Sequence, residues 1–173
     1  MRWQARPRSI TNRKALMPTI REAQTAADIE QVRELFIEYQ AALGVDLCFQ
    51  GFNEELAALP GRYSRPSGRL LLAVDGSRVL GVVALRSVSE TDCEMKRLYV
   101  RPSGRGLGLG RLLTTTLIDE ARLAGYQRML LDTLPSMAQA QAMYRSMRFT
   151  EIQPYYNNPV DGTLYMALSL RDV

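Results

Sequence analysis

The chain contains no histidine, only two cysteines and no long run of apolar residues. Without histidine it cannot build a Ser-His-Asp triad, a Cys-His dyad, an HExxH zinc motif or the H-x-E signature of deaminases. Cys48 and Cys93 lie far apart in sequence and form neither a CxxC motif nor a disulfide framework. No metal site is therefore implied, and a reducing, cytoplasmic location is expected.

The apolar runs that exist are short. The longest, Leu70–Val74 and Val79–Leu85, fall well below the roughly 20 residues that a membrane-spanning helix needs. The first sixteen residues also lack the apolar core and the small-residue cleavage site of a secretory signal. We expect no membrane partner.

The rest of the composition is typical of one globular domain. The chain has 173 residues, of which 46% are apolar and 23% charged, and a core of this size needs no disulfide or metal to stabilise it. There are no repeats, low-complexity tracts or internal linkers. We expect a single domain over residues 17–173.

The net charge of +4 is concentrated in a basic leader, residues 1–16, which carries four arginines, one lysine and no acid. Without this leader, 17 basic residues face 18 acidic ones, so the remainder is nearly neutral. A basic leader can attract nucleic acid or a membrane surface, and it also resembles a transit peptide. We expect a disordered tail, or an extension upstream of a start at Met17, and no nucleic-acid partner.

Periodicity and turn residues predict the elements of the domain. A capping box, Thr25–Asp28, begins a long helix that ends at Gly44. Asp75–Ser77 separates two apolar runs and predicts a hairpin. A second capping box, Ser136–Gln139, predicts the start of the last helix. The expected strands are 19–23, 69–74, 79–86, 93–100, 128–132, 149–152 and 164–170, and two further helices are expected at 53–58 and 109–124.

A glycine-rich turn, Pro102–Arg111, follows the strand 93–100 and opens the next helix, with glycines at 104, 106, 108 and 110. Glycine permits positive φ angles and close approach of a ligand, and the N–H groups of a helix N-terminus attract anions. The turn therefore predicts a phosphate-bearing ligand; the alternative is a turn with no ligand. The Gly-Lys-Ser/Thr of a P-loop is absent, and the glycine spacing does not fit a dinucleotide fingerprint.

Within this turn, Arg105–Gly110 (Arg-Gly-Leu-Gly-Leu-Gly) resembles the coenzyme A pyrophosphate loop of the GCN5-related N-acetyltransferases (GNAT), Arg/Gln-x-x-Gly-x-Gly/Ala. The preceding residues 94–102 resemble the fourth strand of that family, and the order of elements agrees from about Pro18 to Leu170. The resemblance implies an α+β fold, an α/β sandwich. Its sheet is mixed and mostly antiparallel, with six to seven strands, a splayed fourth and fifth strand and about four helices.

The resemblance also implies acetyl-CoA as co-substrate. The fourth strand would pair with the pantetheine arm, and the thioester would lie where the fourth and fifth strands separate. An N–H of the fourth strand would polarise the thioester carbonyl. Ser136 follows the fifth strand, where the family often has asparagine; it caps the helix, contacts the coenzyme, or does both. The implied cofactor-binding residues are Leu98, Tyr99, Val100, Arg105, Gly106, Leu107, Gly108, Leu109, Gly110, Arg111 and Ser136.

Two residues are candidates for the proton transfers. Glu94 stands where histone-modifying members have a general base for the attacking amine; alternatively it faces solvent or pairs with Lys96 or Arg97, and a water chain is the base. Tyr144 stands where the family often has a tyrosine that protonates the departing thiolate; alternatively it is a core residue. Arg148 replaces a glycine that caps this helix in the family with a positive φ.

Phe49, Phe52, Tyr155 and Tyr156 fall in segments that border the acceptor cleft of this fold, where they either bind the acceptor or only pack. The implied activity is acetyl transfer to a primary amine of a small molecule, an amino acid or a protein. One alternative is a non-catalytic acyl-CoA-binding or sensor domain. Another, a nucleic-acid-binding module, would depend on the leader alone. We expect a monomer or a homodimer.

Overall fold

The computed structural model describes residues 17–171, so the leader 1–16 lies outside the described residues. Within them, seven strands form one sheet in the order β1-β2-β3-β4-β5-β7-β6. The strands are β1 (Thr19–Glu22), β2 (Arg69–Asp75), β3 (Arg78–Ser87), β4 (Asp92–Val100), β5 (Arg128–Thr133), β6 (Thr150–Ile152) and β7 (Leu164–Ser169). The α-helices are α1 (Ala26–Leu43), α2 (Phe52–Ala58), α3 (Leu109–Leu123) and α4 (Ala138–Ser146).

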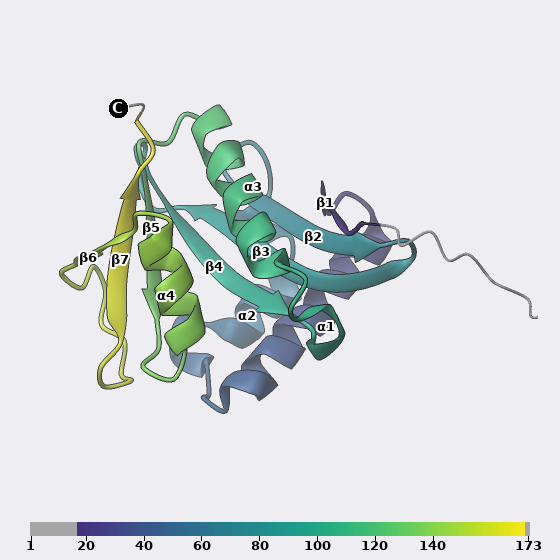
Figure 1. Ribbon diagram of the computed structural model, residues 1–173, viewed down its shortest axis with the longest axis horizontal. Helices are drawn as coiled ribbons and strands as arrows, with labels where there is room; N and C mark the ends of the chain where they lie inside the picture. Colours follow the sequence, from purple (N-terminus) through teal and green to yellow (C-terminus); the bar gives the residue numbers. More distant parts are fainter. Residues whose placement is uncertain (1–16, 172–173) are drawn as a thin grey trace, which may run out of the picture.

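The sheet lies between two layers of helices. Figure 1 shows α3 and α4 on one face and α1 and α2 on the other. Every neighbouring strand pair is antiparallel except β4 and β5, which run parallel because α3 carries the chain back between them. This is the expected mixed, mostly antiparallel sheet with four α-helices, and that prediction is confirmed.

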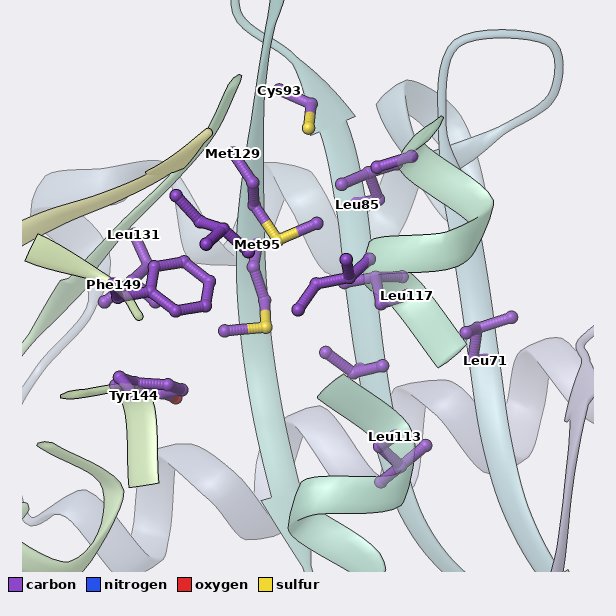
Figure 2. Packing of buried hydrophobic residues seen from close by; sticks show 14 of the residues in the cluster. Leu71, Leu85, Cys93, Met95, Leu113, Leu117, Met129, Leu131, Tyr144 and Phe149 are labelled. Atoms are coloured by element: carbon purple, nitrogen blue, oxygen red, sulfur yellow. The ribbon is translucent and has the colours of Figure 1, made fainter. Parts of the chain in front are cut away.

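Each face of the sheet buries its own hydrophobic cluster, because successive residues of a strand point to opposite faces. On one side, strand residues such as Met95 and Leu131 pack with Leu113 and Leu117 of α3 and with Tyr144 of α4 (Figure 2). On the other side, α1 packs against β2 and β3 through Val32, Leu35, Phe36, Leu70, Leu72 and Ala84.

The helix caps follow the sequence at one helix and depart from it at another. The Thr25 Oγ1 accepts from the Asp28 N–H and the Asp28 carboxylate accepts from the Thr25 N–H, each at 3.1 Å, so the first capping box is confirmed. The second is wrong: α4 begins at Ala138, and no side chain caps it. The reason is a turn in which the Met137 N–H donates to the Leu134 carbonyl at 3.0 Å, which delays the helix beyond Ser136.

Arg148 adopts the left-handed conformation that its place at the end of α4 predicts, with a φ of 69°. Glycine occupies such a position without strain, whereas a residue with a Cβ pays a conformational cost. The chain nevertheless completes the turn, because the Arg148 N–H donates to the Arg145 carbonyl and the Phe149 N–H to the Tyr144 carbonyl, each at 3.0 Å.

The fork between β4 and β5 is the feature that positions the site. The two strands pair with each other at only three positions, the last being Glu94 with Leu130. Beyond that point β4 continues to Val100 and β5 to Thr133 without pairing with each other. On the other edge of β4 the register with β3 shifts between Val82 and Ala84. Arg97 lies within this bulge with a φ of 58°. The strand bends there, as β-bulges cause strands to do.

Candidate active site

A pocket occupies the fork between β4 and β5. Its wall combines residues of α1, β4, β5 and α4 with the segment that follows α1. The polar and charged residues that line it are Tyr39, Gln50, Lys96, Arg97, Asp132, Thr133, Tyr144 and Asn158. The unpaired ends of the two strands thus form an opening between the two faces of the sheet.

A groove leads from the glycine turn to this pocket. It is lined by six of the residues predicted to bind the cofactor: Leu98, Tyr99, Val100, Arg105, Gly110 and Ser136. The groove and the fork pocket share Tyr39, Leu43, Leu98 and Met137, so the two hollows adjoin each other. We refer to the two together as the channel from the glycine turn to the fork.

The remaining predicted cofactor residues have different environments. Leu109 is buried in the core beneath the turn, whereas the Leu107 side chain is 57% exposed. Arg111 extends toward α4, where its Nη2 donates to the Ser146 Oγ at 2.6 Å. The backbone of these residues, rather than their side chains, is what the turn can offer to a ligand.

Gly106 and Gly108 have φ angles of 78° and 72°, which an L side chain rarely adopts. A Cβ at either position would meet nothing within 4 Å, so the turn is open on that side. Gly108 is the N-cap of α3 and provides no side chain to cap it. The N–H groups of the first helical turn are therefore free of a side-chain cap, an arrangement that suits a phosphate.

Tyr144 is both a core residue and part of the pocket wall. Its side chain is 4% exposed and its ring packs against Phe149 with the centroids 5.7 Å apart (Figure 2). Within residues 17–171 its hydroxyl has no hydrogen-bond partner, although it lines the fork. Burial raises the pKa of Tyr144 above its usual value, so the phenol keeps its proton at neutral pH and can donate it.

Glu94 is held by other side chains and does not line the pocket. It is 1% exposed. Its Oε2 accepts from the Arg86 Nε at 2.7 Å, its Oε1 accepts from the Tyr155 hydroxyl at 2.8 Å, and Lys96 Nζ lies 3.7 Å from Oε1. The sequence predicted that Glu94 is exposed, paired with Lys96 or Arg97, or the general base. The structure shows that it is buried and paired, with Lys96 and with Arg86, a partner that the sequence did not suggest. Its role as a base stays a prediction.

Lys96 and Asp132 face each other just beyond the last paired positions of the fork. Lys96 Nζ donates to Asp132 Oδ1 at 3.2 Å, and Asp132 Oδ2 accepts from the Tyr156 hydroxyl at 2.7 Å and the Asn158 amide at 3.1 Å. Burial by itself raises the pKa of Asp132, but the charge of Lys96 and these hydrogen bonds outweigh it, so the pKa lies below its usual value. Asp132 is therefore a stable carboxylate.

Arg97 occupies the bulge of β4 and ties it to the segment around α2. Its Nε and Nη2 donate to the Glu55 carboxylate at 3.0 and 2.8 Å, and its Nη1 donates to the Gln50 Oε1 at 2.9 Å. The guanidinium also lies 5.1 Å from the centroid of the Phe52 ring. These contacts fix β4 at its bulge, just beyond the point where it separates from β5.

The four aromatic residues expected at the acceptor cleft are not equivalent. Tyr155 and Tyr156 pack against each other and against Tyr165, with ring centroids 5.4 to 5.6 Å apart, and their hydroxyls hold Glu94 and Asp132. Phe52 is 1% exposed and belongs to the core on the α1 side, away from the pocket wall. Phe49 lies in the 3-10 turn Cys48–Gln50, and its side chain lies outside what the structure describes.

Thr133 carries a buried hydroxyl that no other residue of the described chain satisfies. Thr133 lines the fork at the end of β5, and its Oγ1 is buried with no hydrogen-bond partner. Such orphaned groups are rare in native proteins and cost about 1–3 kcal/mol when left unpaired. An unpaired group on a pocket wall is a natural contact for a ligand.

The sequence reasoning missed several of these polar residues because no motif marks them. A signal was present nonetheless: Asp132 and Thr133 interrupt an apolar strand, and Lys96 is the only lysine after residue 14. Polar residues in a strand that is otherwise buried require partners. The need for partners could have marked these positions in the sequence, but it could not have identified the partners.

Two further findings concern residues 17–171. None of the helices there has the length and apolar character to cross a membrane. In the same residues, no three side chains of the metal-ligating types come together.

The forked sheet, the glycine turn and the channel between them together define the fold of a coenzyme-A-dependent acetyltransferase. The model of the acetyltransferase (GNAT) family matches residues 29–149. The chain is 41% identical over 145 residues to an uncharacterized N-acetyltransferase of Schizosaccharomyces pombe, covering 83% of this chain and 89% of that protein. The chain belongs to the GNAT family of acetyltransferases, as its sequence motifs predicted, and it is an acyltransferase.

Two other similarities are consistent with this. An uncharacterized N-acetyltransferase of Dictyostelium discoideum is 32% identical, over 83% of this chain and 95% of that protein. The solved structure of the Salmonella typhimurium protein yncA with its cofactor acetyl-CoA superimposes with a TM-score of 0.66 at 22% identity, covering 90% of this chain and 95% of that one. At that identity the second similarity shows the fold alone.

Proposed function

We propose that this protein transfers an acetyl group from acetyl-CoA to a primary amine of a small molecule, an amino acid or a protein. The observation that carries the proposal is the pair of adjoining hollows from the glycine turn to the fork, where Tyr144 lines the wall. A single domain over 17–173 would suffice for this reaction, and we propose that it acts in the cytoplasm.

Acetyl-CoA supplies the acetyl group as a thioester. The backbone of residues 105–111 would hold its pyrophosphate, and the edge of β4 that β5 leaves free, from Leu98 to Val100, would hold the pantetheine arm. A backbone N–H at the bulge would stabilise the charge that develops on the thioester oxygen.

The amine nitrogen attacks the thioester carbon, the carbon–sulfur bond breaks, and the nitrogen loses a proton to water as the amide forms. Tyr144 would donate its proton to the departing thiolate and recover one from solvent. The free hydroxyl at the fork favours this catalytic role over that of an acyl-CoA sensor, which would not need an acid there.

The direct test is calorimetric titration with acetyl-CoA, followed by an assay of thiol release with a panel of amines. Binding with release of coenzyme A is the expected result. Binding without release with any amine would favour the sensor, and failure to bind either acetyl-CoA or coenzyme A would refute the proposal.

A change of Thr133 to valine is expected to act oppositely on stability and on binding. Valine has the same shape but no hydroxyl, so it removes an unsatisfied buried group and is expected to raise the free energy of unfolding by about 1 kcal/mol. If the hydroxyl contacts the thioester arm, acetyl-CoA should bind about five- to tenfold more weakly. Thermal unfolding and titration measure the two effects, and Thr133→Ser, which keeps the hydroxyl, should preserve binding. Unchanged affinity in Thr133→Val would exclude this contact.

A change of Glu94 to glutamine distinguishes an anchor from a general base. Because the substitution leaves Arg86 without its carboxylate and Lys96 with Asp132 alone, it should lower the free energy of unfolding by about 3 kcal/mol. On folded protein, kcat should fall less than about tenfold, whereas losing a general base costs about 10²–10⁴-fold. Glu151→Gln, which breaks the exposed pair with Arg145, is the matched control and should change stability by less than about 1 kcal/mol. A large loss of kcat with unchanged stability would restore Glu94 as the base.

A further inference from the structure

Six charged side chains lie together on the side of the fork opposite Tyr144, and their formal charges cancel. The cations are Arg86, Lys96 and Arg97, and the carboxylates are Glu55, Glu94 and Asp132. Their arrangement is uneven, however. Lys96 and Arg97 line the fork pocket, whereas Glu55 and Glu94 lie outside its wall. Among its lining residues this wall has two cations, Lys96 and Arg97, and one carboxylate, Asp132.

The one carboxylate that the described residues contribute to this wall is already occupied. Asp132 Oδ1 accepts from Lys96, and its Oδ2 accepts from Tyr156 and Asn158. An acceptor with several ammonium groups would find no free carboxylate here. Binding it would require breaking a buried pair, which is strongly unfavourable.

The two cations, by contrast, retain unused donors. A lysine ammonium has three N–H groups, of which Lys96 gives one to Asp132. An arginine has five, of which Arg97 uses three on Glu55 and Gln50. The amide of Asn158 lies beside them, and Leu43, Val45 and Leu47 form an apolar part of the same wall.

We propose that the acceptor is a free amino acid with an apolar side chain, whose carboxylate interacts with the positive wall formed by Lys96 and Arg97. This inference rests on the proposed acetyl transfer and narrows its substrate. Nearby positive charge also favours the neutral form of an amine. The wall would thus hold the acceptor and help its amine to lose a proton, although Glu94 is engaged elsewhere.

The test uses acceptors that differ only in the carboxylate: leucine, leucinamide and isopentylamine, within a panel of the twenty amino acids, their amides and spermidine. Thiol release from acetyl-CoA gives kcat/KM, compared per neutral amine so that differences in amine pKa do not intervene. Since hydrogen bonds to a charged group contribute about 1.5–3 kcal/mol, we expect the amino acid to exceed its amide by at least about tenfold.

The possible outcomes test the amino-acid acceptor separately from acetyl transfer itself. If amides, simple amines or spermidine react as well as amino acids or better, the inference fails and acetyl transfer stands. The inference also fails if acetyl-CoA binds and no amino acid is acetylated. If acetyl-CoA does not bind, both fail.

A variant locates the effect. Lys96→Gln should reduce the ratio of kcat/KM between leucine and leucinamide at least about fivefold, because one of the two cations is lost. A ratio is independent of the amount of folded protein. Arg78→Gln, which removes an exposed cation at the start of β3, should leave the ratio unchanged. An unchanged ratio in Lys96→Gln would contradict the assignment to this wall; if that variant does not fold, the wild-type series decides.

Discussion

Replacement of Gly108 by aspartate is expected to weaken acetyl-CoA binding by about a hundredfold or more. Gly108 is the N-cap of α3, has a φ of 72° and has open space around it. A carboxylate there would lie beside the pyrophosphate. Two unit charges about 4 Å apart repel by about 4 kcal/mol at an effective dielectric constant of about 20, and tenfold in affinity corresponds to about 1.4 kcal/mol.

The matched control is Gly108→Asn, which has the same shape without the charge. Asparagine and aspartate are the side chains that adopt the left-handed conformation most readily, so both variants should fold. Calorimetric titration with acetyl-CoA should show a loss of less than about tenfold for asparagine, with the difference between the two variants shrinking at high salt. Equal and normal binding by both variants would mean that the pyrophosphate lies elsewhere.

The second large effect is expected from Tyr144→Phe. Loss of the acid that protonates the thiolate should lower kcat by about 10²–10⁴-fold. Stability should not fall, since the hydroxyl has no partner within residues 17–171, and the ring packing against Phe149 is kept. The KM for acetyl-CoA should change little. Because burial raises the pKa of Tyr144, the wild-type acid stays protonated from neutral into alkaline pH, and its activity is lost only as the pH rises through that raised pKa.

Tyr126→Phe provides a matched control for this measurement. Tyr126 is also buried, but its hydroxyl donates to the Ser67 carbonyl at 2.7 Å. Its loss should lower the free energy of unfolding by about 1 kcal/mol and leave kcat unchanged. A Tyr144→Phe enzyme that releases coenzyme A at the wild-type rate would remove Tyr144 from the catalytic scheme.

The amino-acid sequence determined the elements of the fold and the position of the glycine turn. Alternating and helical periodicities, a capping box at Thr25 and the hairpin turn at Asp75 describe interactions between residues close in sequence, so they can be read without a structure. The same holds for the glycine turn, whose spacing is a property of one segment. Even the positive φ of Arg148 followed from its place at a helix end.

The start of α4 is the exception among the local features. Ser136 and Gln139 have the spacing of a capping box. A turn over Leu134–Met137 includes Ser136, however, so the helix begins only after that turn, at Ala138. Element boundaries are the part of a structure that a local sequence pattern predicts least well.

The tertiary structure alone decided the roles of the charged residues. Glu94 on β4 pairs with Arg86 on the neighbouring strand β3 and with Tyr155 from a distant loop. Asp132 meets Lys96 only because the fork opens between them. Burial makes an unpaired charge costly, so each buried group takes the partners that the packed chain brings to it. Which partners those are depends on contacts between residues distant in sequence, and no local pattern encodes them.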